Sequence, residues 1–256
     1  MIKRIFKAGL NGMMRPLGLE IRRWRRSTHY RYAECLRLAM NGVARPLAID
    51  IGAHEGESAS AIRREFPKAR VLSIEPSPHI FARLQTQASQ DGFECFNLAL
   101  GEAEGTLDFN CYEKSQCNSL LPPDPARHAV LAALREPATV VRVPVTTLDR
   151  FMQDRGLEGA EVHYLKMDVQ GFENRVLRGA QETLAKTRHI MIEVSFCRAY
   201  ADGCLVDEVC QLIRGQGFKL VTTVGYMMAE DEDELLSTDF FFSRLIDAKY
   251  AAIASL

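Results

Sequence analysis

Short apolar runs alternate with segments of helical periodicity from residue 46 onward. Apolar runs of this length, bounded by polar or glycine-containing turns, are typical of buried strands. They predict strands at 47–51, 70–75, 93–98, 162–168, 190–194, 218–222 and 239–243. Helices are expected between them, at 58–66, from 78, from 173 and at 205–215. The alternation predicts an α/β fold: a mostly parallel seven-stranded sheet with helices on both faces.

The alternation is interrupted between residues 105 and 149. Two further strands are expected at 106–109 and 140–145, and the segment 110–138 between them reads as a long loop with a short helix. Insertions of this length in compact domains often act as lids or substrate-binding elements. A surface excursion without functional consequence is the alternative.

The first 45 residues differ in charge from the rest of the chain. They hold 11 Lys and Arg against two Glu, a balance of +9, so the remainder carries −10. Apolar residues at 2, 6, 10, 13 and 17 have helical spacing. We therefore predict a basic helical extension at 1–45 and a Rossmann-like domain at 46–256.

Two interpretations of the extension remain open. Its helices could pack on the main domain, or they could contact an anionic membrane surface or an anionic substrate. Packing on the main domain is the expected arrangement, but the run Arg22–Arg26, with Trp24 at its centre, supports the second, because Trp suits an interface and Arg suits phosphate.

Composition argues against a membrane-spanning, secreted or zinc-binding protein. The chain is 47% hydrophobic and 25% charged, and no apolar run approaches the ~18 residues of a membrane span. The N-terminus lacks the pattern of a secretory signal. Seven cysteines without a C-x-x-C pair favour a reduced, cytoplasmic protein, membrane-peripheral if the basic extension binds lipid. Cysteines and histidines show no zinc-ligand spacing, and no metal ligands are assigned.

A glycine turn follows the first predicted strand, in Asp50-Ile-Gly52-Ala-His54-Glu-Gly56. Gly52 permits a tight turn close to a ligand, and Gly56 allows the next helix to approach it. The dinucleotide fingerprint G-x-G-x-x-G is absent. A carboxylate at 50 would oppose a pyrophosphate but suits the cationic sulfonium and amino group of S-adenosyl-L-methionine. His54 is a weaker candidate for the same site.

The second and third predicted strands end in further candidates for cofactor binding. Glu75 and Pro76 close the second strand, where a carboxylate can accept hydrogen bonds from both hydroxyls of a ribose. The segment with Asn97 and Ala99 closes the third strand and could line an adenine pocket. The glycine turn and Glu75 together predict a nucleoside cofactor.

The fourth and fifth strands carry the candidate catalytic residues. Lys166 and Asp168 alternate along one strand and therefore share one face, while Glu193 ends the next strand. Charges on an interior strand are costly without partners, so a structural Lys166–Asp168 pair is one interpretation. The other is placement of a methyl acceptor, with Asp168 or Glu193 as general base and Lys166 holding the carboxylate. A divalent cation held by these carboxylates is a further alternative.

These motifs together resemble the FkbM family of methyltransferases. The resemblance runs from about residue 47 to 195, and its most specific block is K-x-D-x-Q-G-x-E at Lys166–Glu173. It implies a class I methyltransferase fold, S-adenosyl-L-methionine as methyl donor, and O-methylation of sugars, lipid-linked glycans or natural products. By matching positions it places Asp50, Gly52, Gly56, Glu75 and the Asn97–Ala99 segment around the cofactor. Asn118-Ser119-Leu120 resembles a family segment near the same pocket.

Other function classes fit less well. An NAD-dependent oxidoreductase is disfavoured because G-x-G-x-x-G and a Tyr-x-x-x-Lys pair are both missing. A nucleic-acid methyltransferase is disfavoured because the fourth strand ends in Asp-Val-Gln-Gly rather than in a motif for base amines. A catalytically inactive cofactor-binding scaffold is the non-enzymatic alternative. The expected partner is a small-molecule or glycan acceptor; the sequence does not identify it.

Overall fold

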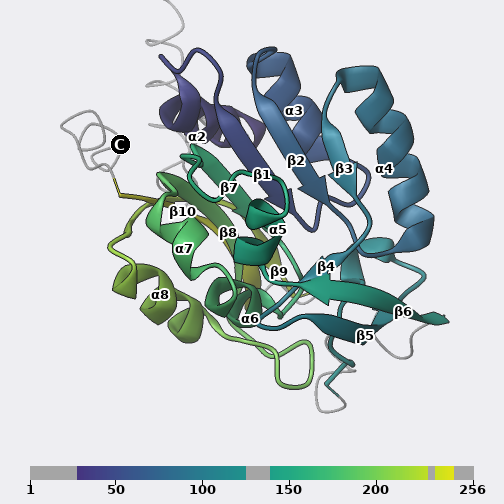
Figure 1. The fold of residues 1–256 in the computed structure, drawn as a ribbon. Helices are drawn as coiled ribbons and strands as arrows, with labels where there is room; N and C mark the ends of the chain where they lie inside the picture. Colours follow the sequence, from purple (N-terminus) through teal and green to yellow (C-terminus); the bar gives the residue numbers. More distant parts are fainter. Residues whose placement is uncertain (1–27, 125–138, 230–233, 245–256) are drawn as a thin grey trace, which may run out of the picture.

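The structure is a computed structural model that describes residues 28–124, 139–229 and 234–244 (Figure 1). The main strands are β1 (Leu47–Ile51), β2 (Arg70–Ile74), β3 (Glu94–Phe96), β7 (Tyr164–Met167), β8 (His189–Ser195), β9 (Lys219–Met228) and β10 (Leu235–Ser243). The helices are α2 (Thr28–Met40), α3 (Glu57–Glu65), α4 (Pro78–Asp91), α5 (Leu148–Gln153), α6 (Glu173–Arg178), α7 (Gln181–Ala185) and α8 (Val206–Gly215).

The main sheet has the strand order β3-β2-β1-β7-β8-β10-β9. The pairs from β3 to β8 are parallel, and β10 runs antiparallel to both β8 and β9. The predicted Rossmann-like, mostly parallel seven-stranded sheet is thereby confirmed. The chain progresses outward from β1 to β3 on one side and through β7 and β8 on the other. Such a switch point leaves a crevice at the carboxyl ends of the strands, where ligands bind in open α/β sheets.

Helices cover both faces of the sheet, because the interior strands alternate apolar side chains between two cores. Ile49, Leu165 and Ile192 belong to the core shared with α5, α6, α7 and α8. Ala48 and Met191 belong to the opposite core, shared with α2, α3 and α4. Side chains one position apart on a strand face opposite sides. Asp50 and Lys166, which are register partners on β1 and β7, therefore face the α2–α3 side.

A second sheet, of order β4-β6-β5, lies beside the main one. Its strands are β4 (Ala99–Leu100), β5 (Gly105–Cys111) and β6 (Thr139–Thr146), and a 3-10 turn, η2 (Ser115–Cys117), follows β5. The inserted β/loop element predicted at 105–149 is therefore present. Residues 125–138 of its loop lie outside the described residues. Isolated bridges join Ser119 to Asn110 of β5 and Pro123 to Tyr200, which follows β8.

The predicted N-terminal extension is only partly described. Helix α2 packs against the sheet, with Leu36 and Met40 buried in the core of the α2–α4 face. Residues 1–27, including Arg22–Arg26 and the predicted apolar positions from 2 to 17, lie outside the described residues. None of the helices in the described ranges combines the length and the apolar character of a membrane span.

Candidate active site

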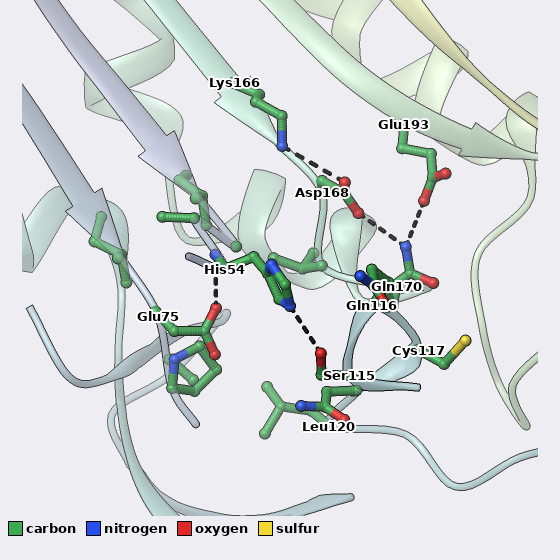
Figure 2. A pocket seen from close by; sticks show the side chains of 18 of the residues that line it. His54, Glu75, Ser115, Gln116, Cys117, Leu120, Lys166, Asp168, Gln170 and Glu193 are labelled. Carbon is green, nitrogen blue, oxygen red and sulfur yellow. Dashed lines mark hydrogen bonds and ion pairs between the residues drawn. The ribbon is translucent and has the colours of Figure 1, made fainter. Parts of the chain in front are cut away.

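A cavity of about 410 Å³ opens at the carboxyl ends of β1, β2, β7 and β8 (Figure 2). The segment 114–120, which includes η2, forms the wall opposite the strand ends. Eight of the predicted site residues line this cavity: Gly52, His54, Glu75, Pro76, Ala99, Lys166, Asp168 and Glu193. Most of the predicted site residues therefore lie together at the carboxyl edge of the sheet.

The turn after β1 can be built only with glycine at position 52. Gly52 has φ +75, and a Cβ there would lie 1.8 Å from the carbonyl oxygen of Asp168. The backbone N–H groups of Gly52 and Ala53 both donate to the carbonyl of Ile74, which holds the turn against β2. The cavity floor is thus backbone rather than side chain.

Gly56 has a different role from the one predicted. It has φ +95 and precedes α3, and a Cβ there would lie 2.9 Å from Leu84 Cδ1 and 3.0 Å from Phe93 Cζ. It does not line the cavity, because it faces α4 and β3 instead. Its lack of a side chain permits close packing of α3 on α4 rather than close approach to a ligand.

Asp50 lies behind the cavity wall rather than on it. Its side chain is fully buried, and Lys166 Nζ is 3.9 Å from Oδ1. Neither carboxylate oxygen meets hydrogen-bond geometry with any described residue. Burial raises the pKa of Asp50 to about 6, although the Lys166 ammonium opposes that shift. The register with Lys166 explains this placement, since both side chains point to the α2–α3 face.

Glu75 is buried at the end of β2 with both oxygens engaged. Oε1 accepts from the backbone N–H of Ser77 at 2.8 Å, and Oε2 accepts from that of His54 at 3.0 Å. Burial raises the pKa of Glu75 to about 7, and the two backbone donors oppose this rise. A carboxylate offers about four lone-pair positions, so Glu75 can still accept hydrogen bonds from a ligand in the cavity.

His54 spans the cavity from the glycine turn to η2 (Figure 2). Its Nε2 lies 2.9 Å from Ser115 Oγ, and its Nδ1 lies 3.5 Å from Glu57 Oε1. Contact with Glu57 raises the pKa of His54, and burial opposes that rise.

Asn97 and Ser119 lie just outside the cavity and shape it. Asn97 Nδ2 donates to the carbonyls of Glu75 and Pro76, so it fixes the backbone after β2. Ser119 Oγ donates to the carbonyl of Gln170 at 2.8 Å and fastens the 114–120 segment to the end of β7. Both side chains point at backbone groups, which explains why neither lines the cavity.

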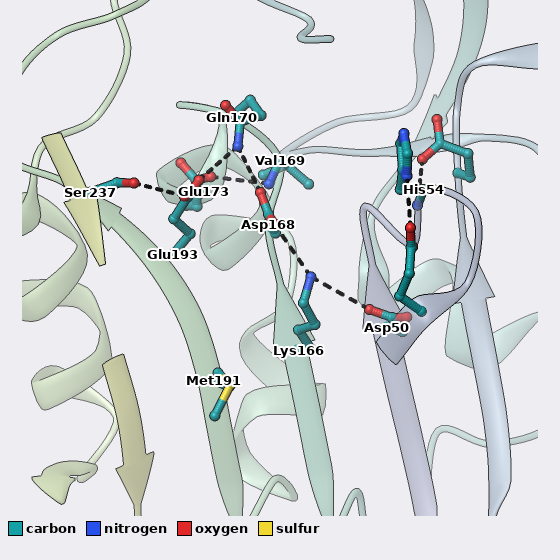
Figure 3. A network of polar contacts seen from close by, with 12 residues as sticks. Asp50, His54, Lys166, Asp168, Val169, Gln170, Glu173, Met191, Glu193 and Ser237 are labelled. Atoms are coloured by element: carbon teal, nitrogen blue, oxygen red, sulfur yellow. Dashed lines mark hydrogen bonds and ion pairs between the residues drawn. The ribbon is translucent and has the colours of Figure 1, made fainter. Parts of the chain in front are cut away.

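The predicted catalytic residues form one connected network (Figure 3). Lys166 Nζ lies 3.5 Å from Asp168 Oδ2 and, on its other side, 3.9 Å from Asp50 Oδ1. Gln170 Nε2 donates to Asp168 Oδ1 at 2.9 Å and to Glu193 Oε2 at 2.7 Å. Glu193 Oε1 accepts from Ser237 Oγ at 2.9 Å. The ends of β7, β8 and β10 are thereby joined.

Charge in this network is unevenly compensated. Burial lowers the pKa of Lys166, but the carboxylates of Asp168 and Asp50 outweigh burial and raise it above its usual value. Burial, together with Asp168 and Glu173, raises the pKa of Glu193. The cavity lining holds four carboxylates (Glu57, Glu75, Asp168, Glu193) against Lys114 and Lys166. The lining therefore has more carboxyl than ammonium groups, and a cationic ligand would favour the ionised forms of Glu75 and Glu193.

The sequence model described as the methyltransferase FkbM domain matches residues 50–220, two thirds of the chain. The chain belongs to the FkbM family of methyltransferases. The matched region contains all of the residues that line the cavity except Met227 of β9. The family predicted from the motifs is confirmed.

Curated relatives agree with this assignment. The 2-O-methyltransferase NoeI of Sinorhizobium fredii is 29% identical over 69% of this chain and 73% of its own length. The 31-O-demethyl-FK506 methyltransferase FkbM of Streptomyces tacrolimicus is 26% identical over 73% and 77%. A solved methyltransferase FkbM from Methylobacillus flagellatus KT is 17% identical, with a TM-score of 0.48 over 84% of this chain and 50% of that one.

Two parts of this FkbM-family site were not predicted as site residues. The first is Gln170, which the Lys166–Glu173 block contains and whose place two residues after Asp168 is a usable signal. The second is the segment from Lys114 to Cys117, which carries no motif and reaches the cavity only through the inserted sheet.

A metal cluster is not evident in this FkbM-family site. Within residues 28–124, 139–229 and 234–244, no group of three or more His, Cys, Asp or Glu side chains has the arrangement of a metal site. Gln170 stands between Asp168 and Glu193, so its amide already contacts both carboxylates that a cation would use.

Proposed function

We propose that this protein is an S-adenosyl-L-methionine-dependent O-methyltransferase that acts on a hydroxyl of a sugar, a glycan or glycolipid, or a natural product. The observation that carries the proposal is the carboxyl-lined cavity at the carboxyl ends of β1, β2, β7 and β8. The names of two relatives, a 2-O-methyltransferase and a 31-O-demethyl-FK506 methyltransferase, support transfer to oxygen.

The cavity residues fit the proposed cofactor. Glu75 ends β2 with lone pairs free for a ribose diol, and the Gly52 turn keeps the adjacent wall free of side chains. Carboxylates on the lining complement a sulfonium and an ammonium group. When bound, S-adenosyl-L-methionine supplies an electrophilic methyl group.

The chain's own residues would then orient the acceptor and remove its proton. An in-line displacement gains chiefly from alignment, which can contribute on the order of 7–11 kcal/mol. A hydroxyl is a poor nucleophile, so a base within hydrogen-bond reach is needed. Asp168 is our candidate base because its side chain is 33% exposed and lines the cavity. Lys166 would hold its carboxylate in place, and Glu193 is the second candidate.

Cofactor binding is the first test. Isothermal titration calorimetry should detect binding of S-adenosyl-L-homocysteine and no binding of NAD or NADP. Binding of NAD in preference would reject the proposal. Glu75→Gln should weaken binding of S-adenosyl-L-homocysteine by about 10- to 100-fold, the effect of losing hydrogen bonds to a charged acceptor.

Asp168→Asn tests the base. Methyl transfer from labelled S-adenosyl-L-methionine to a panel of hydroxylated sugars and natural products should fall by about 10²- to 10⁴-fold. The affinity for S-adenosyl-L-homocysteine should stay within about threefold, because one carboxylate is replaced by an amide of the same shape. Full activity in Asp168→Asn, with loss in Glu193→Gln, would move the base to Glu193. Loss of activity with EDTA and recovery with Mg²⁺ would assign the carboxylates to a cation instead.

A further inference from the structure

Gln170 is the one side chain that contacts both candidate bases among the described residues. Its Nε2 lies 2.9 Å from Asp168 Oδ1 and 2.7 Å from Glu193 Oε2 (Figure 3). An amide nitrogen has two hydrogens, so both can be donated at once, one to each carboxylate. The opposite amide orientation would place a carbonyl oxygen against two carboxylates, which is repulsive. The contacts themselves therefore select this orientation.

The other end of Gln170 is fastened to the wall of the cavity formed by 114–120. The hydroxyl of Tyr200 lies 2.7 Å from the carbonyl oxygen of Cys117 and 3.2 Å from Gln170 Oε1, and because it has one hydrogen to donate, the closer Cys117 carbonyl is its main acceptor. The carbonyl of Gln170 accepts from Ser119 Oγ at 2.8 Å. Cys117 lines the cavity, so Gln170 connects the two carboxylates to the wall opposite the strand ends.

The backbone of Gln170 is also in an uncommon conformation. Its φ is +53, in the left-handed region that side chains other than Gly and Asn seldom adopt. Strain of this kind persists when surrounding contacts over-determine it, and it is common at functional sites. Here the contacts are those of the amide and the carbonyl just described. The turn from Asp168 to Gly171 thus holds the Gln170 side chain between β7 and β8.

The surroundings of Glu193 explain why such a donor matters. Titratable groups face Glu193 from the end of β7, α6, β10, η2 and the segment after β8: Asp168, Glu173, Asp239, Cys117 and Tyr200. The nearby cation Lys166 pairs with Asp168 and Asp50 instead. The neutral donors Gln170 and Ser237 are therefore what favours the ionised form of Glu193.

We propose that Gln170 is a positioning residue for methyl transfer: its amide holds Asp168 and Glu193 side by side, and its carbonyl groups tie that pair to the cavity wall. This inference rests on the proposed function only in one respect, namely that the reaction performed by Asp168 and Glu193 is methyl transfer. The hydrogen bonds from Gln170 to Asp168 and Glu193, here called the clamp, are present in the free protein and can be measured without an acceptor.

Gln170→Met tests the clamp, because Met has a similar length and no donor. In the full-length protein labelled with ¹³C at the side-chain carboxyls, NMR titration follows Glu193, whose signal is assigned by its loss in Glu193→Gln. Removal of one donor should raise the Glu193 midpoint by about one pH unit or more. With an acceptor in hand, kcat should fall by about 10-fold or more and the acid limb of its pH profile should move to higher pH. The affinity for S-adenosyl-L-homocysteine should stay within about threefold.

Gln90→Met makes the same chemical change at an exposed position on α4 and should alter none of these values. If Gln170→Met does not fold, Gln170→Asn replaces it, since Asn tolerates the left-handed region but is one methylene too short to reach both carboxylates. It should shift the Glu193 titration in the same direction. An unchanged Glu193 midpoint in a folded variant would overturn the proposal. Failure to bind S-adenosyl-L-homocysteine in the wild type would reject the proposed function and leave this titration result standing.

Discussion

Single residues at this site are governed by burial as much as by charge. Asp50, Glu75 and Glu193 all have raised pKa values, and burial is the first cause in each case. Their environments nevertheless differ. Asp50 is paired with Lys166 behind the cavity wall, while Glu75 accepts two backbone N–H groups and keeps lone pairs toward the cavity. The affinity of a ligand in the cavity should therefore depend on the ionisation of Glu75.

Affinity for the cofactor product should depend on the ionisation of Glu75. Its pKa is raised from 4.5 to about 7 by burial, so it is largely protonated at pH 6 and ionised at pH 8. The ionised form accepts more hydrogen bonds from a ribose, so the affinity for S-adenosyl-L-homocysteine should increase by about 10-fold from pH 6 to pH 8. Calorimetric titrations at several pH values measure this change. Glu75→Gln should bind more weakly at every pH, and a pH dependence that survived in that variant would contradict the assignment.

The free energy of unfolding should also depend on Glu75, but the contribution of this group should decrease as the pH rises. The folded protein holds the Glu75 proton more tightly than the unfolded chain does, so this group contributes stability at low pH. That contribution is lost as the pH rises from about 4.5 to about 7. Urea unfolding of wild type and Glu75→Gln across that range should show a smaller decline in the variant. An equal decline would place the responsible proton elsewhere.

At the scale of elements, turns rather than helices or strands determine where the functional groups lie. The turn after β1 presses against the turn after β7, because the Gly52 Cα position lies over the carbonyl of Asp168. The turn after β7 in turn holds Gln170 and Gly171 at positive φ. These two turns meet at the floor of the cavity, so a change in the backbone of one turn displaces the other.

Gly52→Ala should therefore be strongly destabilising. A Cβ would lie 1.8 Å from a backbone oxygen at φ +75, and we expect a loss of at least about 2 kcal/mol in the free energy of unfolding. Urea unfolding followed by circular dichroism measures it. Gly159→Ala is the matched control, because no heavy atom lies within 4 Å of a Cβ there. Equal stability of the two variants would contradict the close approach of the two turns.

At the scale of the whole molecule, α2 closes one face of the sheet. Leu36 and Met40 belong to the same core as Ile62 of α3 and Leu84 of α4. The hydroxyl of Tyr32 is buried beside Asp50, which lies behind the cavity wall, and beside Lys166, which lines the cavity. Part of the basic segment that the sequence set apart as an extension therefore covers the back of the site.

Met40→Ala measures how far α2 is integrated into the domain. The Met40 side chain is fully buried, so its truncation should lower the free energy of unfolding by about 2–4 kcal/mol in a single cooperative transition. Asn41→Ala, at the exposed residue that follows, should change it by less than about 0.5 kcal/mol. A loss below about 1 kcal/mol for Met40→Ala would indicate that α2 is separable from the domain.

Local pattern determined the elements and the edge of the sheet that carries the chemistry. The runs at 47–51 and 70–75 predicted β1 and β2 nearly to the residue, and Glu75, Lys166, Asp168 and Glu193 were identified from their places at strand ends. This is possible because the period of apolar residues and the position of a strand's end depend on neighbours along the chain. Short elements were harder. Helix α7 is capped by Asp149, more than thirty positions earlier, and such a partner is invisible in local sequence.

Tertiary structure decided which of the candidate groups face one another. The sequence alone placed Asp50 at the cofactor, but the β1–β7 register turns it to Lys166. Glu193 and Asp168 meet only because β8 lies beside β7, and Gln170 joins them only because the turn at 168–171 folds back between the strands. Contacts between residues distant along the chain follow from strand order and from the packing of the inserted sheet. Strand order and the packing of the inserted sheet leave no periodic pattern in the sequence. The sequence by itself therefore determined which functional groups are available, and the fold determined how they are arranged.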